Sequence, residues 1–222
     1  MIGTPRKRVA VFISGGGSNM LSLADACAAP DFPAEIVAVL SDKASAGGLA
    51  KAEARGIKTF VFERKSFASK QDHEAAILAA LDEIRPDILC LAGFMRLLSG
   101  DFISRYEGRI LNIHPALLPL FAGLHTHQRA LDAGMKIAGC TVHFVTEGMD
   151  EGPILAQAAV PVLAGDTAET LAARVLTVEH KLYPLSLKLL AEGKVRMEGN
   201  RAALSSLEAS PLTDQRMISA GI

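Results

Sequence analysis

The sequence has no tryptophan and few aromatic residues of any kind, which make up 5% of its 222 residues. It also lacks a surplus of positive charge, since 23 Lys and Arg face 24 Asp and Glu. A charge-balanced chain is not expected to have a nucleic-acid backbone as its main partner. No apolar run suits a signal peptide or a membrane span, because residues 15–17 are glycines that interrupt the first one. These absences favour a cytoplasmic enzyme that acts on small molecules.

Cysteine is scarce, and the three cysteines have no paired spacing: Cys27, Cys90 and Cys140. An odd number of unpaired cysteines is typical of reduced thiols in a cytosolic protein. His125 and His127 lie two residues apart, but no third ligand follows at a convincing distance. We therefore expect no metal site.

Short apolar runs alternate with helical patterns through the first half of the chain. The apolar runs lie at residues 9–13, 35–40, 59–62 and 88–92. Three helical patterns lie between them: one begins at residue 18, and the other two span residues 47–55 and 69–84. This alternation predicts an α/β fold of the Rossmann-like, doubly wound kind, a mostly parallel sheet with helices on both faces. We expect one domain over residues 1–200 and a C-terminal tail over 201–222.

The pattern changes after Gly139. Residues 140–145 and 154–162 indicate longer strands, which we interpret as a C-terminal antiparallel extension of the sheet. Residues 167–191 predict a long helix, with Thr167 as its cap and a kink at Pro184. Glu198–Asn200 predicts a hairpin turn.

The glycine-rich segment Ser14–Asn19 follows the first predicted strand and precedes a helix. Glycines let the backbone approach a ligand closely, and free N–H groups at a helix start attract an anion. The spacing matches neither a nucleoside-triphosphate loop nor, cleanly, the dinucleotide fingerprint. It favours a site for a single phosphate. The alternative is a tight turn in which Ser18 or Asn19 caps the helix.

Asn112 and His114 lie two residues apart at the end of an apolar strand, just before Pro115. Alternate residues of a strand point to the same side, so both should face one site. An amide can donate a hydrogen bond to a developing oxyanion and an imidazole can carry a proton, which together suit acyl transfer. The alternative is a histidine whose hydrogen bonds are satisfied by backbone.

An acidic turn, Glu147–Pro153, offers carboxylates that could stabilise the imidazolium form of His114. Asp150, Glu151 and Glu147 are all candidates, and ordinary solvated carboxylates are the alternative. His143 is interpreted as either a core histidine or a residue of the site wall.

These segments together resemble the phosphoribosylglycinamide formyltransferases, a folate-dependent family, from about residue 9 to residue 200. The blocks that carry the resemblance are 13–19, 91–98, 111–119, 123–127 and 142–153. The Asn-x-His-Pro and Asp-x-Gly-Pro blocks are shared by the folate formyl-transferring relatives. The Gly-x-Gly-Ser-Asn loop and Thr177–His180 point to the glycinamide branch.

The resemblance implies transfer of the formyl group of 10-formyltetrahydrofolate, a cosubstrate, to the amine of 5-phosphoribosylglycinamide, without a metal. The N-terminal half would hold the ribonucleotide phosphate, and the C-terminal half would hold the folate and the catalytic loop. The implied catalytic residues are Asn112, His114 and Asp150. The implied ribonucleotide-binding residues are Gly17, Ser18, Asn19 and Glu179. The implied folate-binding residues are Lys70, Met95, Arg96, Leu97, Leu98, Asn112, Thr146, Glu147, Gly148, Met149 and Asp150.

The sequence departs from the family pattern at Ala116, Leu120 and Phe121, where Ser, Lys and Tyr are common, and Lys70 stands where Arg is usual. Lys supplies the charge of Arg but not its bidentate fork. Charge balance disfavours a methionyl-tRNA formyltransferase, and the early first strand disfavours a formyltetrahydrofolate hydrolase with a regulatory domain. A nucleotide-binding module without chemistry would leave Asn112 and His114 without a shared purpose. The sequence indicates no oligomeric state.

Overall fold

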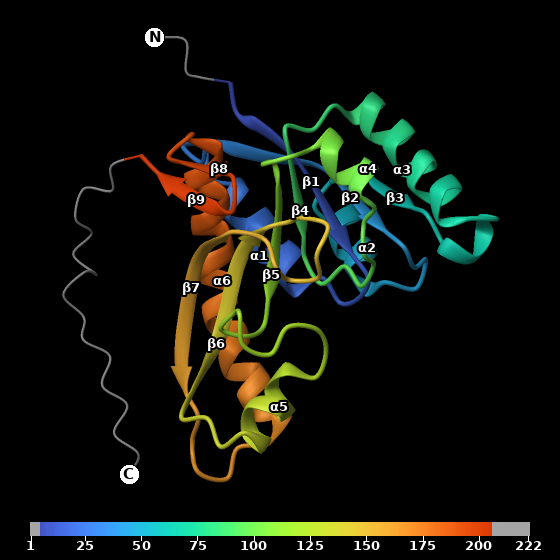
Figure 1. Ribbon diagram of the computed structural model, residues 1–222. Helices are drawn as coiled ribbons and strands as arrows, with labels where there is room; N and C mark the ends of the chain where they lie inside the picture. Colours follow the sequence, from blue (N-terminus) through green and yellow to red (C-terminus); the bar gives the residue numbers. More distant parts are fainter. Residues whose placement is uncertain (1–4, 206–222) are drawn as a thin grey trace.

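The structure is a computed structural model and describes residues 5–205. Its main sheet has seven strands in the order β3-β2-β1-β4-β5-β6-β7 (Figure 1). The first five strands in the chain pair in parallel, and β6 and β7 continue the sheet antiparallel to their neighbours. The predicted fold class, with its antiparallel extension, is confirmed. The strands are β1 (Lys7–Ile13), β2 (Ala34–Ser41), β3 (Thr59–Val61), β4 (Ile88–Leu91), β5 (Ile110–His114), β6 (Ile137–Phe144) and β7 (Ile154–Pro161).

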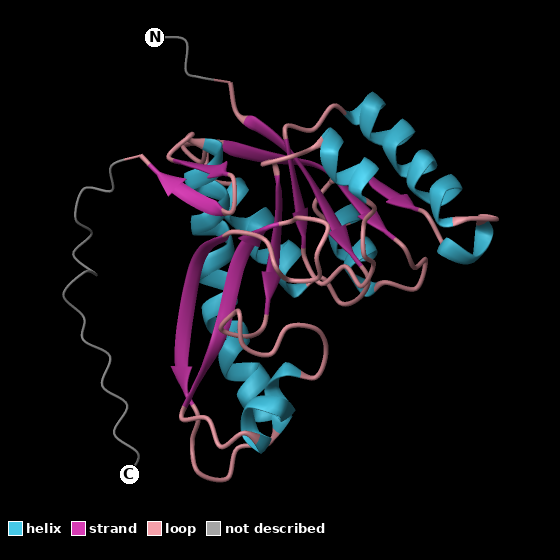
Figure 2. Cartoon of the chain, viewed as in Figure 1, coloured by secondary structure: helices cyan, strands magenta, loops and turns pink. Residues whose placement is uncertain are grey.

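Helices cover both faces of the sheet (Figure 2). They are α1 (Ser18–Cys27), α2 (Gly47–Glu53), α3 (Lys70–Ile84), α4 (Gly100–Arg105), α5 (Thr126–Asp132) and α6 (Ala168–Ala191), with a short 3-10 helix η1 (Arg64–Ser66). Alternate residues of β1 enter two separate cores, as the period of two in a strand requires. Val9 and Val11 pack with α1, α2 and α6, whereas Ala10 and Phe12 pack with α3 and α4.

The helix limits follow from local chemistry. Ser69 caps α3 by accepting a hydrogen bond from the Asp72 N–H, and Arg85 ends the helix in the left-handed region. Thr167 caps α6 as predicted, and its capping box is completed by Thr170. The α6 helix continues through Pro184 to Ala191.

Three features differ from the sequence prediction. Helices α4 and α5 were not predicted, since six or seven residues carry too little periodicity to be recognised. Strand β6 begins at Ile137, earlier than expected. The predicted hairpin turn joins β8 (Val195–Glu198) to β9 (Arg201–Leu204), so the hairpin enters the segment expected to be a tail. The remainder of that segment, 206–222, lies outside the described residues.

The strand order reverses between β1 and β4, which are neighbours in the sheet although two strands separate them in sequence. In an open α/β sheet, ligands bind beyond the carboxyl ends of the strands at such a point. The loops after β1, β4 and β5 all leave this edge, and each carries a predicted site segment. Over residues 5–205, no helix combines the length and apolar character needed to cross a membrane.

Candidate active site

A cleft of about 480 Å³ opens at this edge of the sheet. Its lining includes Asn112 and His114 from β5, Asp150 from the loop before β7, and Glu179 from α6. Two smaller hollows, of about 80 Å³ and 410 Å³, share lining residues with it on the side of Met95–Leu98. With Asn19 and Met95–Leu97, which also line it, the cleft brings together predicted residues from five parts of the chain.

The centre of the cleft holds His114, which is almost fully buried. Its Nε2 atom lies 3.0 Å from the carbonyl oxygen of Phe121, which can only accept, so Nε2 carries a proton. Its Nδ1 atom lies 3.3 Å from Oδ2 of Asp150. Nδ1 is thus the ring nitrogen that faces the Asp150 carboxylate.

The geometry selects Asp150 among the three candidate carboxylates. The backbone N–H of Gly123 donates to Asp150 Oδ2 at 2.9 Å, which holds that oxygen beside His114. Glu151 instead packs against Gly148, and the carboxylate of Glu147 lies against Gly100.

Backbone strain gathers around this centre. Asp150, Phe121 and His125 all have φ near +58°, an uncommon conformation for residues other than glycine. Such strain is found at functional sites, where the surrounding structure holds a side chain in place. Here Phe121 and Asp150, two of the strained residues, are the partners of His114.

The glycine-rich loop leads directly into α1. Gly17 has φ +73°, and a Cβ atom on it would lie 2.8 Å from the Cα of Gly48, so only glycine fits. Neither Ser18 nor Asn19 caps the helix, which excludes the alternative interpretation of this loop. The first N–H groups of α1 therefore remain available to an anion. Gly17 and Ser18 lie beside the cleft rather than in its lining.

The side chain of Asn19 reaches across to α6, where its Nδ2 atom donates to Oε2 of Glu179 at 2.6 Å. Glu179 is buried, and desolvation raises the pKa of its carboxyl despite the opposing hydrogen bond from Asn19. A buried carboxylate at a cleft wall is suited to accept hydrogen bonds from hydroxyl groups.

The segment after β4 forms the opposite wall. Met95 and Leu97 are 60% and 59% exposed, which is unusual for large apolar side chains, whereas Leu98 is buried. Arg96 lies between them and donates through Nε to Oδ2 of Asp42 at 2.7 Å. The loop Thr146–Asp150 lines the smaller hollow on this side. Apolar side chains with one guanidinium fit a flat, partly anionic ligand.

Lys70 lies at the far end of this wall, in the hollow of about 410 Å³. Its Nζ atom is 3.7 Å from Oε1 of Glu74, and its side chain is half exposed. Arg64 lines the same hollow and was not predicted. Asp42, which accepts the hydrogen bond from Arg96, was not predicted either. The position of Asp42 directly after β2, at the ligand-binding edge, is a signal that could have found it.

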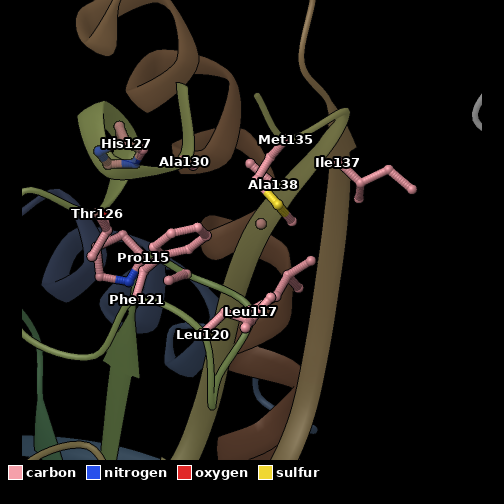
Figure 3. A pocket seen from close by; sticks show the side chains of 12 residues that line it. Pro115, Leu117, Leu120, Phe121, Thr126, His127, Ala130, Met135, Ile137 and Ala138 are labelled. Carbon is pink, nitrogen blue, oxygen red and sulfur yellow. The ribbon is translucent and has the colours of Figure 1, made fainter. Parts of the chain in front are cut away.

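A small apolar pocket of about 10 Å³ lies behind the loop after β5, between Phe121, Leu117 and Met135 (Figure 3). It has room for about one water molecule, so it is a gap in the packing rather than a substrate site. Phe121 contributes only its backbone carbonyl to His114. The departures from the family pattern at Ala116, Leu120 and Phe121 thus leave the cleft's polar atoms in place.

Burial also shifts the pKa of several cysteines and histidines. Burial raises the pKa of each of the three free cysteines to about 12. Burial lowers the pKa of His127 and that of His143. No cluster of three or more metal-binding side chains occurs among residues 5–205.

Comparison with known proteins agrees with this arrangement. The family model described as formyl transferase matches residues 7–187. The chain is 44% identical to the phosphoribosylglycinamide formyltransferase of Escherichia coli K12, over 91% of this chain and 96% of that protein. It is 51% identical to the trifunctional purine biosynthetic protein adenosine-3 of Bos taurus, over 88% of this chain, and it spans only about a fifth of that longer protein.

A solved structure gives the same result in three dimensions. The phosphoribosylglycinamide formyltransferase of Brucella melitensis is 77% identical, with a TM-score of 0.82, over 84% of this chain and 96% of that chain. The sequence match, the shared fold and the cleft built on Asn112, His114 and Asp150 all lead to one assignment. The chain belongs to the formyl transferase family.

Proposed function

We propose that this protein transfers the formyl group of 10-formyltetrahydrofolate to the amine of 5-phosphoribosylglycinamide. The products are the N-formyl ribonucleotide and tetrahydrofolate, and the reaction belongs to purine biosynthesis. The observation that carries the proposal is the position of Asn112, His114 and Asp150 between two chemically different ends of one cleft. Relatives named for this reaction, aligned over nearly their full length, support it.

The two ends of the cleft suit the two substrates. The N-terminus of α1 and the carboxylate of Glu179 offer groups for a phosphate and for sugar hydroxyls. The wall formed by Met95–Leu98 and the loop Thr146–Asp150 offer apolar surface and backbone groups for a pterin, and Arg96 and Lys70 offer positive charge for the folate carboxylates. This division supports Gly17–Asn19 and Glu179 as ribonucleotide-binding residues and the opposite wall as the folate site.

The chain's own groups account for the chemistry. The amine nitrogen forms a bond to the formyl carbon, the bond from that carbon to the folate nitrogen breaks, and a proton passes from the amine to the folate nitrogen. Asn112 donates an N–H to the oxygen that becomes negative, and the positive charge of protonated His114 stabilises the same oxygen. Asp150 stabilises that charged form and keeps the ring oriented. Loss of one such donor typically slows turnover about 100- to 1,000-fold.

We further propose that the enzyme works in the cytosol on small-molecule substrates. Three buried cysteines that form no disulfide are consistent with a reducing compartment.

The test follows absorbance as the formyl folate is consumed, with and without the ribonucleotide, for the wild-type protein and for His114→Ala. We expect consumption that requires the ribonucleotide and that falls about 100-fold or more in the variant. Consumption without the ribonucleotide would indicate a hydrolase. Tight ribonucleotide binding without turnover would indicate a binding module.

A further inference from the structure

His143 occupies a position that the proposed mechanism does not use. It lies in β6 directly opposite Asn112 in β5, because the antiparallel register pairs these two residues. Directly paired residues of neighbouring strands project from the same face of the sheet. His143 is 2% exposed, so its ring is enclosed by protein and its hydrogen bonds must be made internally.

Both ring nitrogens of His143 have partners. Nδ1 lies 2.8 Å from the carbonyl oxygen of Phe144, and Nε2 lies 3.1 Å from Nδ2 of Asn112. A Cβ atom on Gly152 would overlap that same carbonyl oxygen, so the glycine lets the chain pass close to the ring. The two contacts and the tight packing hold the imidazole in one orientation.

The chemistry of the partners decides the tautomer of His143. A carbonyl oxygen can only accept, so Nδ1 carries the proton. Burial lowers the pKa of His143 despite the opposing effects of the Phe144 carbonyl and Asp150, so the ring is neutral near pH 7. In a neutral ring with Nδ1 protonated, Nε2 is bare and acts only as an acceptor.

A bare Nε2 also decides the orientation of the Asn112 amide. An amide oxygen at 3.1 Å from a bare nitrogen would place two acceptors together, whereas the amide nitrogen can donate. The amide therefore keeps its nitrogen toward His143 and retains a second N–H for the cleft, which Asn112 also lines. A flipped amide would instead present its oxygen, which repels a developing negative charge.

We propose that His143 is a positioning residue that fixes the amide orientation of Asn112 for the formyl transfer. This inference rests on the proposed function. Asp150 Oδ1 lies 3.7 Å from Nε2 of His143, too far for a hydrogen bond, so His143 acts through Asn112.

Two variants separate the two hydrogen bonds of His143. In His143→Asn, the short amide can still donate to the Phe144 carbonyl but offers no acceptor to Asn112. In His143→Gln, the longer amide can place its oxygen near the position of Nε2. We expect kcat of His143→Asn to fall about 10- to 100-fold, with KM of both substrates nearly unchanged, and His143→Gln to retain most of the activity.

A double-mutant comparison tests whether His143 acts through Asn112. Adding His143→Asn to Asn112→Ala should cause no further loss of kcat, because the amide that it orients is already absent. Independent, multiplicative losses in the double variant would overturn the inference. Loss of activity in His143→Gln equal to that in His143→Asn would also overturn it.

A readout that needs no substrate is nitrogen-15 NMR of the histidine rings in the wild-type protein. We expect His143 to be neutral with a protonated Nδ1 and a bare Nε2, and a protonated Nε2 would refute the argument even if the variants fail to fold. A wild-type protein without formyl transfer would refute the proposed function and this inference together. An active wild type with His143→Asn within about threefold of it would refute this inference alone.

Discussion

Replacement of Asp150 by asparagine tests the charge at the centre of the cleft. The side chains have the same shape, and an asparagine oxygen can still accept the hydrogen bond from the Gly123 N–H. What is lost is the negative charge 3.3 Å from Nδ1 of His114. The variant therefore separates the electrostatic role of Asp150 from its role in holding the loop.

The expected effect follows from the geometry. Two unit charges about 4 Å apart attract by about 4 kcal/mol at an effective dielectric constant of about 20. The Asp150 side chain is 13% exposed, so solvent weakens this attraction. We take about 2–3 kcal/mol, which corresponds to a loss of about 30- to 150-fold in kcat.

The assay is kcat for Asp150→Asn and for the wild type, measured with saturating substrates at one pH. Glu151→Gln is the matched control, because this neighbouring carboxylate packs against Gly148 instead, and it should keep near-wild-type kcat. An unchanged kcat in Asp150→Asn, or an equal loss in the Glu151 variant, would refute the reasoning.

Three further predictions concern stability and reactivity. Because burial raises the pKa of Glu179, its ionisation destabilises the fold as the pH rises above about 4.5. Glu179→Gln should therefore melt at a higher temperature than the wild type at pH 7 but not at pH 4. The same variant should raise KM for the ribonucleotide about 10- to 150-fold, because it loses the carboxylate acceptor. Gly17→Ala should lower the free energy of unfolding by about 2–4 kcal/mol in denaturant titrations, because Gly17 has a positive φ and an added Cβ would meet Gly48. Gly15→Ala is the control: an added Cβ there has no atom within 4 Å, so the free energy of unfolding should change by less than about 1 kcal/mol. A disulfide reagent at pH 8 should label no thiol until the protein is unfolded, and rapid labelling of the native protein would contradict the burial of Cys27, Cys90 and Cys140.

The periodic spacing of hydrophobic residues in the sequence predicted most of the fold. The continuous apolar run of residues 88–92 predicted a strand, and all four residues of β4, Ile88–Leu91, are buried, as in a parallel sheet covered on both faces. The capped helical pattern that begins after Thr167 predicted α6. Helices α4 and α5 escaped prediction because their one or two turns contain too few residues for a period to emerge.

The spacing of residues along the chain also predicted part of the candidate site. Asn112 and His114 face one cleft because they are two apart on a strand, a fact that needs no tertiary information. The chain could not show which acidic residue meets His114, since Glu147, Asp150 and Glu151 lie in one turn. The left-handed conformation of Asp150 and the Gly123 N–H decided that choice.

By itself, then, the sequence determined most of the secondary structure, the parallel sheet and the residue types at its functional edge, because these depend on the spacing of neighbours along the chain. Only the tertiary structure decided which distant side chains meet. Asn19 and Glu179 are 160 residues apart and share a hydrogen bond, and His143 faces Asn112 because of the register between β5 and β6. Such contacts depend on strand order and register, which a sequence pattern repeating every two or 3.6 residues does not specify.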